Sequence, residues 1–182
     1  SRRRHTRLLT VTGVQTCALP ICPFTEQWRD LPTVNDPRVR TITVRQLLQH
    51  TSGFSNLRGI FFGGGGTDWR SAAIASVGST LDTDPGTKYR YSNANFVILA
   101  TLVEQITGLP FDEAIRRRVF EPLGITSAQL TGTRVTDPTG PAYAVDSSRN
   151  YMEVLGPAGA WCMTAADTAR ILAALQPDRK ST

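Results

Sequence analysis

Two side chains suited to acid–base chemistry stand two residues apart in the tripeptide Tyr91-Ser92-Asn93. In extended backbone, residues two apart project from the same side, so the phenol and the carboxamide would share one surface. A phenol hydroxyl can pass on a proton, and a carboxamide both donates and accepts hydrogen bonds. This pair is therefore the first candidate for a reaction site. The alternative is a buried tyrosine with a bonded hydroxyl, followed by an ordinary asparagine cap.

The segments around the tripeptide predict how it is held. The sequence at 85–87, Pro-Gly-Thr, is typical of a turn. Ser92 or Asn93 can cap a helix that runs to about Thr107 and is closed by Gly108. Because this helix is apolar on nearly all sides, we expect it to be buried and to give the candidate site a rigid support.

Other patterns predict a mainly helical chain, with loops and short strands at 126–157. Gly53 is expected to end the first predicted helix, at 44–50. The four glycines at 63–66 predict a surface loop, because no Lys-Ser or Lys-Thr follows them as in a phosphate-binding loop. Helices are predicted at 44–50 with a capping box of Thr43 and Gln46, at 69–77, at 111–120, and at 165–175 with a capping box of Thr164 and Asp167.

The two ends of the chain are expected not to belong to the fold. Residues 11–21 and 178–182 match the translation of a standard short-read sequencing adapter, read in opposite directions. Residues 1–7 match the preceding primer, and residues 8–10 fill the place of a variable index. A natural basic leader is the alternative, but Gln15 and Pro20 interrupt its apolar stretch. We therefore expect residues 22–177 to be the native part, a partial domain, with translated adapter at 1–21 and 178–182.

The charge of the chain depends on those ends. The formal net charge is +5, from 20 Lys and Arg against 15 Asp and Glu. The ends hold six of the basic residues and one acidic residue, which leaves fourteen of each in 22–177. A neutral protein gives no support for a nucleic-acid or membrane partner, and the basic run at 116–118 is expected to be an exposed helix face. No run of about 18 apolar residues predicts a membrane-spanning helix.

Three further side chains could in principle react. His50 is the only histidine in 22–177, and its place at a helix end in His-Thr-Ser-Gly favours a structural role. Ser52 has no base motif beside it, so a role in a turn is expected. Cys162 follows Trp161 and is expected to be a small core residue. One histidine without clustered cysteines or carboxylates does not predict a metal site, and no cofactor is implied.

Several stretches in order give the chain a family resemblance. It resembles the serine β-lactamase-related proteins, which include class C β-lactamases, D-alanyl-D-alanine carboxypeptidases and related esterases. The resemblance implies an α/β parent fold of the β-lactamase/transpeptidase type, of which this chain would be mainly the helical part, with few short strands. The stretches are ITVRQLLQHTSGF (42–54), PGTKYRYSNANFVILATLVEQITGLPF (85–111), EPLGITSA (121–128) and GPAGAWCMTAADTARIL (156–172).

The resemblance also implies a reaction, acyl transfer through a serine nucleophile. Such enzymes use three motifs: Ser-x-x-Lys, Tyr-x-Asn, and a Lys- or His-containing triplet that ends in Gly. In the second motif, Tyr91 would be the catalytic proton shuttle, and Asn93 would bind the amide of the substrate and orient the nearby lysine. The implied substrate is a β-lactam, a D-Ala-D-Ala peptide or a small ester. The implied location is bacterial, periplasmic or extracytoplasmic, although no signal region is present in the chain.

The first and third motifs are missing from the chain. Its only lysines are Lys88 and Lys180, and prolines stand three residues before both, so no Ser-x-x-Lys exists. In the family these motifs lie before 42–54 and after the last helix, which would place them outside residues 22–177. We therefore expect the chain as given to lack hydrolase activity. The alternative is a non-catalytic binding or scaffold member of the same fold, and a Ser-x-x-Lys in the flanking gene sequence would argue against it.

Overall fold

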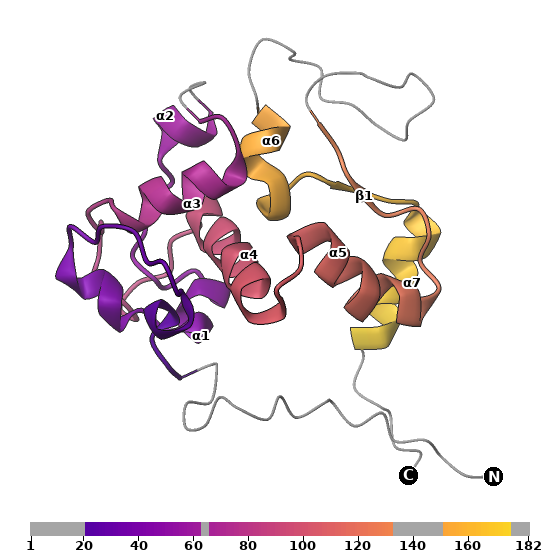
Figure 1. Cartoon of the computed structure of the whole chain (residues 1–182), viewed down its shortest axis with the longest axis horizontal. Helices are drawn as coiled ribbons and strands as arrows, with labels where there is room; N and C mark the ends of the chain where they lie inside the picture. The colour runs from indigo at the N-terminus through magenta and orange to yellow at the C-terminus, as the bar shows by residue number, and fades with distance from the viewer. Residues whose placement is uncertain (1–20, 63–65, 133–150, 176–182) are drawn as a thin grey trace.

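The computed structural model describes residues 21–62, 66–132 and 151–175 of the chain (Figure 1). Nearly all of both adapter-like ends lies outside these ranges. Three of the four glycines at 63–66 do so as well, and so does most of the predicted loop region at 126–157. Within the described ranges the chain is mainly helical, as predicted, with two strands of two residues each.

Helix α4 (Asn93–Thr107) is the central element of this fold (Figure 1). It packs against α1 (Val44–Leu48), α3 (Trp69–Val77) and α5 (Phe111–Ile115). Apolar residues on several of its sides are almost fully buried, which confirms the expectation of a buried support for the candidate site. These residues are Ala94, Val97, Ile98, Ala100 and Leu102.

The ends of α4 are those that the sequence predicts. The Ser92 hydroxyl accepts a hydrogen bond from the Ala94 N–H at 3.2 Å, which satisfies one of the free donors at the helix start. Gly108 follows the helix with φ of 69°, a left-handed conformation that a glycine adopts at little cost. Residues next to one another in sequence make both caps, which is why both can be predicted.

Short elements complete the described fold, and α2 and α6 were not predicted. The predicted helix at 111–120 is α-helical only over α5, because a π-helical turn replaces it from Arg116 onwards. The two strands pair antiparallel, with Gln129 opposite Cys162. The elements are η1 (Phe24–Gln27), η2 (Pro37–Thr41), α2 (Arg58–Phe61), η3 (Arg116–Phe120), η4 (Glu121–Leu123), β1 (Gln129–Leu130), α6 (Tyr151–Leu155), η5 (Gly156–Ala158), β2 (Trp161–Cys162) and α7 (Ala165–Leu175).

A row of aromatic rings joins the central helices to the strand pair. The Phe111 ring centroid lies 6.1 Å from that of Trp69 on α3 and 6.1 Å from that of Trp161 on β2. Trp161 also packs edge-on against Phe120 at 5.0 Å. Each such pair adds about 0.5–1.5 kcal/mol beyond the area that it buries. The strand pair is thereby fixed to α3 and α5.

The predicted capping box of α7 is closed through a third residue. The Asp167 N–H donates to the Thr164 hydroxyl at 3.2 Å, as predicted. The Asp167 carboxylate, however, accepts from the Ser127 hydroxyl at 2.6 Å, and the Thr164 N–H donates to Ser127 Oγ at 3.0 Å. Ser127 therefore completes the box and ties α7 to the loop that precedes β1.

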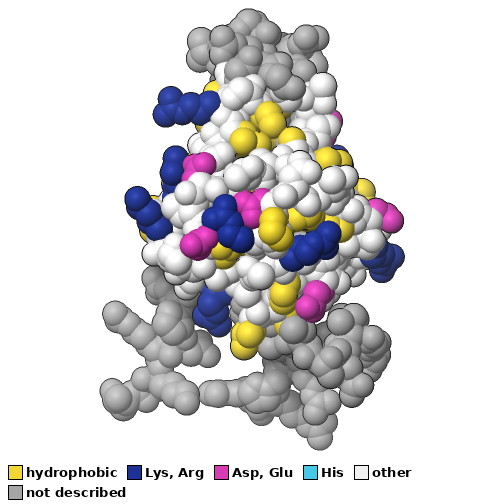
Figure 2. All heavy atoms as spheres, turned by 90° about the vertical axis from the view of Figure 1, so that its left-hand side faces the viewer, with side chains coloured by type: hydrophobic (Ala, Val, Ile, Leu, Met, Phe, Trp, Pro, Cys, Tyr) yellow, Lys and Arg dark blue, Asp and Glu magenta, His cyan; other side chains and the backbone are white. Residues whose placement is uncertain are grey.

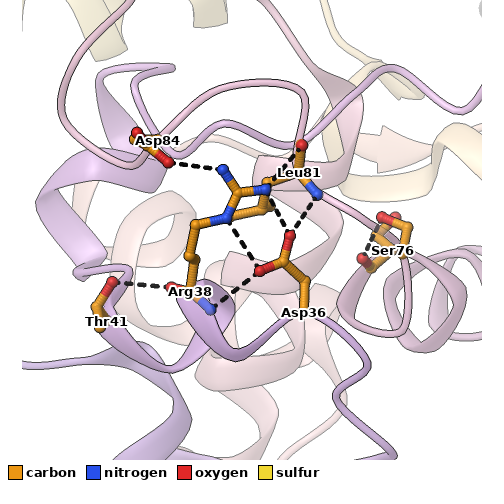
Figure 3. Close-up of polar contacts among 7 residues, drawn as sticks. Asp36, Arg38, Thr41, Ser76, Leu81 and Asp84 are labelled. Atoms are coloured by element: carbon orange, nitrogen blue, oxygen red, sulfur yellow. Dashed lines mark hydrogen bonds and ion pairs between the residues drawn. The ribbon is translucent and has the colours of Figure 1, made fainter.

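A buried carboxylate holds the loop that leads to the tripeptide (Figure 3). Asp36 is 7% exposed and accepts from Nη2 of Arg38 at 2.7 Å and from the Leu81 N–H at 3.0 Å. Arg38 also donates to the Asp84 carboxylate at 2.6 Å. These donors, above all the Arg38 side chain, keep the pKa of Asp36 well below its usual range. Asp36 and Arg38 thus fix residues 81–84.

We expect Asp36→Asn to lower the free energy of unfolding by about 2 kcal/mol at neutral pH, because charge-assisted hydrogen bonds and a buried acceptor are lost. Since the pKa of Asp36 is lowered by folding, its contribution is present above the unfolded value of 3.8 and is lost as the pH falls below it. The difference in the free energy of unfolding between the original chain and Asp36→Asn, measured with urea, should therefore become smaller below about pH 4.

Asp84→Asn is the matched control for this prediction. Asp84 binds the same guanidinium but is 68% exposed, so its loss should cost less than about 1 kcal/mol. Equal losses for the two variants would show that Arg38, and not the buried carboxylate, accounts for the stability of this network.

Candidate active site

The side chains of Tyr91 and Asn93 meet, as their spacing predicts. The Tyr91 hydroxyl donates to Asn93 Oδ1 at 3.0 Å. The residue between them has extended backbone, with φ of −148° and ψ of 128°, which turns its two neighbours to the same side. Tyr91 is 55% exposed and Asn93 is 4% exposed. The phenol is therefore open to an incoming group, and the carboxamide is held against the fold beside it.

Ser92 points the other way and anchors the tripeptide. Its side chain is fully buried, and its hydroxyl donates to the Ser55 carbonyl at 3.0 Å while it caps α4. The Asn93 N–H donates to Oδ1 of Asn56 at 3.2 Å. These contacts fix the backbone on which the phenol and carboxamide are carried.

Residues 50–56 form the support for the tripeptide. Backbone hydrogen bonds join this segment to the chain at 82–90: the Asp82 N–H donates to the Gly53 carbonyl at 2.9 Å, and the Arg90 N–H donates to the His50 carbonyl at 2.7 Å. The Ser52 hydroxyl donates to Oδ1 of Asn95 at 2.6 Å. The support therefore reaches both the approach to the tripeptide and the first turn of α4.

The comparisons with known proteins agree with this arrangement. The family model described as Beta-lactamase matches residues 28–182, which is more than half of the chain. The chain belongs to the beta-lactamase family. Penicillin-binding protein 4* of Bacillus subtilis (strain 168) is 29% identical over 105 residues, which cover 52% of this chain and 22% of that protein.

Solved structures of similar proteins show the fold of this family member. A D-stereospecific amidohydrolase from Streptomyces sp. matches with a TM-score of 0.64 and 25% identity over 87% of this chain and 53% of its own. A beta-lactamase/D-alanine carboxypeptidase from Yersinia pestis matches with a TM-score of 0.65 and 18% identity, over 89% and 49% of the two chains. The fold is therefore β-lactamase/transpeptidase-like, and the described residues form mainly its helical part.

The match covers only a part of each relative. The chain spans less than a third of the length of the curated relatives that it matches, and about half of the length of the solved structures named above. The residues matched include the tripeptide Tyr91-Ser92-Asn93 and its support at 50–56. The family assignment therefore includes the candidate site.

His50 ends α1 in a way that the sequence did not predict. The helix stops at Leu48, and His50 takes a positive φ of 56°. Its N–H donates to the Leu47 carbonyl at 3.2 Å, and the Thr51 N–H donates to the Gln46 carbonyl at 2.9 Å. This pair of bonds is a Schellman motif, in which glycine is the usual residue at the position of His50. Gly53 was expected to end the helix, and that prediction is wrong.

Gly53 serves a different purpose. Its φ is 89°, and a Cβ atom there would lie 2.2 Å from the carbonyl oxygen of Thr83. The two backbone segments can therefore approach only because this residue has no side chain. The glycine seen in the sequence marks a contact between distant segments, not the end of a helix.

The other side chains considered from sequence have structural positions. Ser52 is 1% exposed and bonded to Asn95, in agreement with a role in the turn. Cys162 is half-buried with a free thiol, so the prediction of a core residue is only partly right. Arg116 and Arg117 are exposed and paired with Glu113, as expected of a solvated run. Basic and acidic side chains are likewise interspersed on the face in Figure 2.

Two further properties concern the part of the chain that the structure describes. No three His, Cys, Asp or Glu side chains gather there in a way that could hold a metal ion. No single helix there is long and apolar enough to cross a membrane. Only α4 taken together with Phe111–Leu123 has the length and composition, and these two are bent by 75°.

Proposed function

We propose that the protein that contains this chain is a serine hydrolase that cleaves an amide or an ester through an acyl-enzyme. The substrate would be a β-lactam, a D-Ala-D-Ala peptide or a small ester, and residues 22–177 would be a partial domain of the enzyme. One observation carries the proposal. In a member of the beta-lactamase family, the Tyr91 hydroxyl and the Asn93 carboxamide meet at 3.0 Å at the start of a buried helix.

Each residue of the pair has a distinct role in this proposal. The Tyr91 hydroxyl would carry a proton from the attacking serine to the leaving group, because it is exposed and can both donate and accept. Asn93 accepts from that hydroxyl through Oδ1, which leaves its Nδ2 hydrogens to bind a carbonyl of the substrate. Asn93 is thus a substrate-binding residue that also orients the phenol.

The pair needs partners from elsewhere in the protein. A tyrosine is a poor base at neutral pH unless positive charge lies nearby, and a serine needs a base before it can attack a carbonyl. In the proposed enzyme, a Ser-x-x-Lys motif encoded before residue 22 provides the nucleophile and an ammonium group. Two of the relatives named above are a penicillin-binding protein and a D-alanine carboxypeptidase of bacteria, and this kind of protein favours an extracytoplasmic place of action.

We expect the 182-residue chain not to react covalently with a fluorescent penicillin, because it contains no Ser-x-x-Lys. The complete reading frame, obtained from the flanking gene sequence, should be labelled, and excess unlabelled penicillin should abolish the signal. If the complete frame is not a β-lactam target, turnover of a chromogenic ester or of a D-alanyl amide tests the same chemistry.

A non-catalytic binding or scaffold member of the family is the competing function. It would show the same fold and the same tripeptide but no Ser-x-x-Lys in the complete frame. Labelling of the chain as given, competed by unlabelled drug, would instead place a nucleophile inside residues 1–182 and contradict our account of the missing motif.

A further inference from the structure

His50 has a backbone conformation that disfavours any residue with a side chain. Its φ of 56° is left-handed, which costs a non-glycine residue roughly 1–2 kcal/mol. Glycine would end the helix without this cost. The imidazole ring must therefore make contacts that compensate, and the ring is where a role should be sought.

The ring accepts two hydrogen bonds at one nitrogen. The Ser92 N–H lies 3.2 Å from Nδ1 of His50, and Nδ2 of Asn95 lies 2.9 Å from the same atom. A backbone N–H can only donate, so Nδ1 carries a lone pair and the proton of the neutral ring is on Nε2. This also orients the Asn95 carboxamide, whose Oδ1 is then free to accept from Ser52 at 2.6 Å.

The same ring packs against the tyrosine of the site. Its centroid lies 4.7 Å from that of Tyr91, with Phe96 at 5.4 Å and Tyr89 at 5.9 Å. His50 therefore contacts the phenol ring and also holds the N–H of the residue between Tyr91 and Asn93. Burial of the ring lowers the pKa of His50, which favours the neutral form that can accept both bonds.

We propose that His50, as the neutral Nε2–H tautomer, is the positioning residue that sets the geometry of the Tyr91–Asn93 pair. It fixes the Ser92 N–H through Nδ1 and packs its ring against that of Tyr91. It takes no proton in the reaction. This inference rests on the proposed function for its catalytic meaning, but the hydrogen bonds can be tested without any catalysis.

Two substitutions separate the ring nitrogen from the backbone strain. Asparagine tolerates a left-handed conformation, and its Oδ1 occupies a position along the side chain equivalent to Nδ1, so His50→Asn should keep the acceptor. Glycine removes the acceptor and the ring contacts but also relieves the backbone strain, so the two effects on stability of His50→Gly oppose each other. Thermal unfolding of both variants distinguishes the loss of the acceptor from a failure to fold.

The first measurement is nuclear magnetic resonance of the 182-residue chain. We expect the ¹⁵N resonances of the His50 ring to show an unprotonated Nδ1 and a protonated Nε2. The Ser92 amide should exchange about tenfold faster with solvent in His50→Gly and at the original rate in His50→Asn, with an amide deep in α4 as the reference for global opening. A protonated Nδ1, or Ser92 exchange that is equal in the original chain and the glycine variant, would overturn the proposal.

The second measurement tests the effect on the reaction in the complete reading frame. We expect acylation by penicillin to be about 10- to 100-fold slower in His50→Gly, because the phenol would leave its productive position. His50→Asn keeps the acceptor but not the ring, so it should restore the rate in part. If the nuclear magnetic resonance results are as expected but acylation of His50→Gly is as fast as that of the original protein, the hydrogen bonds exist and the positioning role is refuted. Failure of the proposed function is distinguished from this outcome, since it would abolish labelling in the unmodified frame.

Discussion

Tyr91→Phe should slow acylation of the complete enzyme by roughly 10²- to 10⁴-fold, the range typical for removal of a group that transfers protons. The substitution removes one hydroxyl and keeps the ring that packs against His50 at 4.7 Å. The hydroxyl makes one hydrogen bond, to Asn93 at 3.0 Å, and the side chain is 55% exposed. Its loss should therefore cost no more than about 1 kcal/mol of stability. Stopped-flow or gel-based penicillin labelling measures the rate, and thermal unfolding checks the fold.

Tyr89→Phe is the matched control for this experiment. Tyr89 lies two residues earlier, is 66% exposed and also packs its ring near that of His50, at 5.9 Å. It therefore tests the loss of an exposed phenol hydroxyl in the same segment without touching Asn93. An acylation rate that survives Tyr91→Phe, or that falls equally in both variants, would exclude Tyr91 as the proton shuttle.

The sequence predicts those parts of the site that depend on near neighbours. Alternation of side chains along extended backbone places Tyr91 and Asn93 together, and the structure brings them to 3.0 Å. The Ser92 cap of α4 is predictable for the same reason, because the bond reaches only two residues along the chain. Whether Tyr91 and Asn93 act in catalysis stays a prediction, since geometry alone does not test it.

The support of the site was not predictable in the same way, because its contacts join residues about forty positions apart. His50 was expected to be structural, but nothing local indicates that its ring binds the Ser92 N–H or Asn95. One signal was present: Asn95 follows Asn93 as a second polar residue in the first turn of a helix predicted to be buried. A fully buried carboxamide must find hydrogen-bond partners, so its presence implies a polar neighbour from another segment.

The error at Gly53 has a similar physical origin. A glycine after a helix is most simply explained as its left-handed end, and that explanation uses only local sequence. Here the left-handed position falls on His50, whose ring contacts offset its cost, and Gly53 is required by the approach of Thr83. A close contact between two loops cannot be read from either loop alone.

Gly53→Ala should therefore be among the most destabilising single substitutions in the described chain. The added Cβ would lie 2.2 Å from the Thr83 carbonyl oxygen, and backbone on both sides leaves no flexible side chain to move away. The cost combines a left-handed alanine, roughly 1–2 kcal/mol, with displacement of packed backbone, roughly 1–3 kcal/mol. Displacement would also break the hydrogen bond from the Asp82 N–H to the Gly53 carbonyl. We expect urea unfolding to show a loss of about 2–5 kcal/mol, a large share of the stability of a small domain.

Alanine substitutions at two other glycines measure the conformational and steric contributions separately. Gly108 has φ of 69°, and a Cβ added there would meet no atom within 4 Å, so Gly108→Ala should cost only the conformational part, about 1–2 kcal/mol. Gly59 lies in α2 with neither constraint, and Gly59→Ala should be neutral or slightly stabilising. If Gly53→Ala costs no more than Gly108→Ala, the contact with Thr83 is not tight in solution. If Gly53→Ala loses more stability than the two control variants, it should also slow acylation in the complete frame. The segment that contains Thr83 would be displaced, and it leads directly to Tyr91.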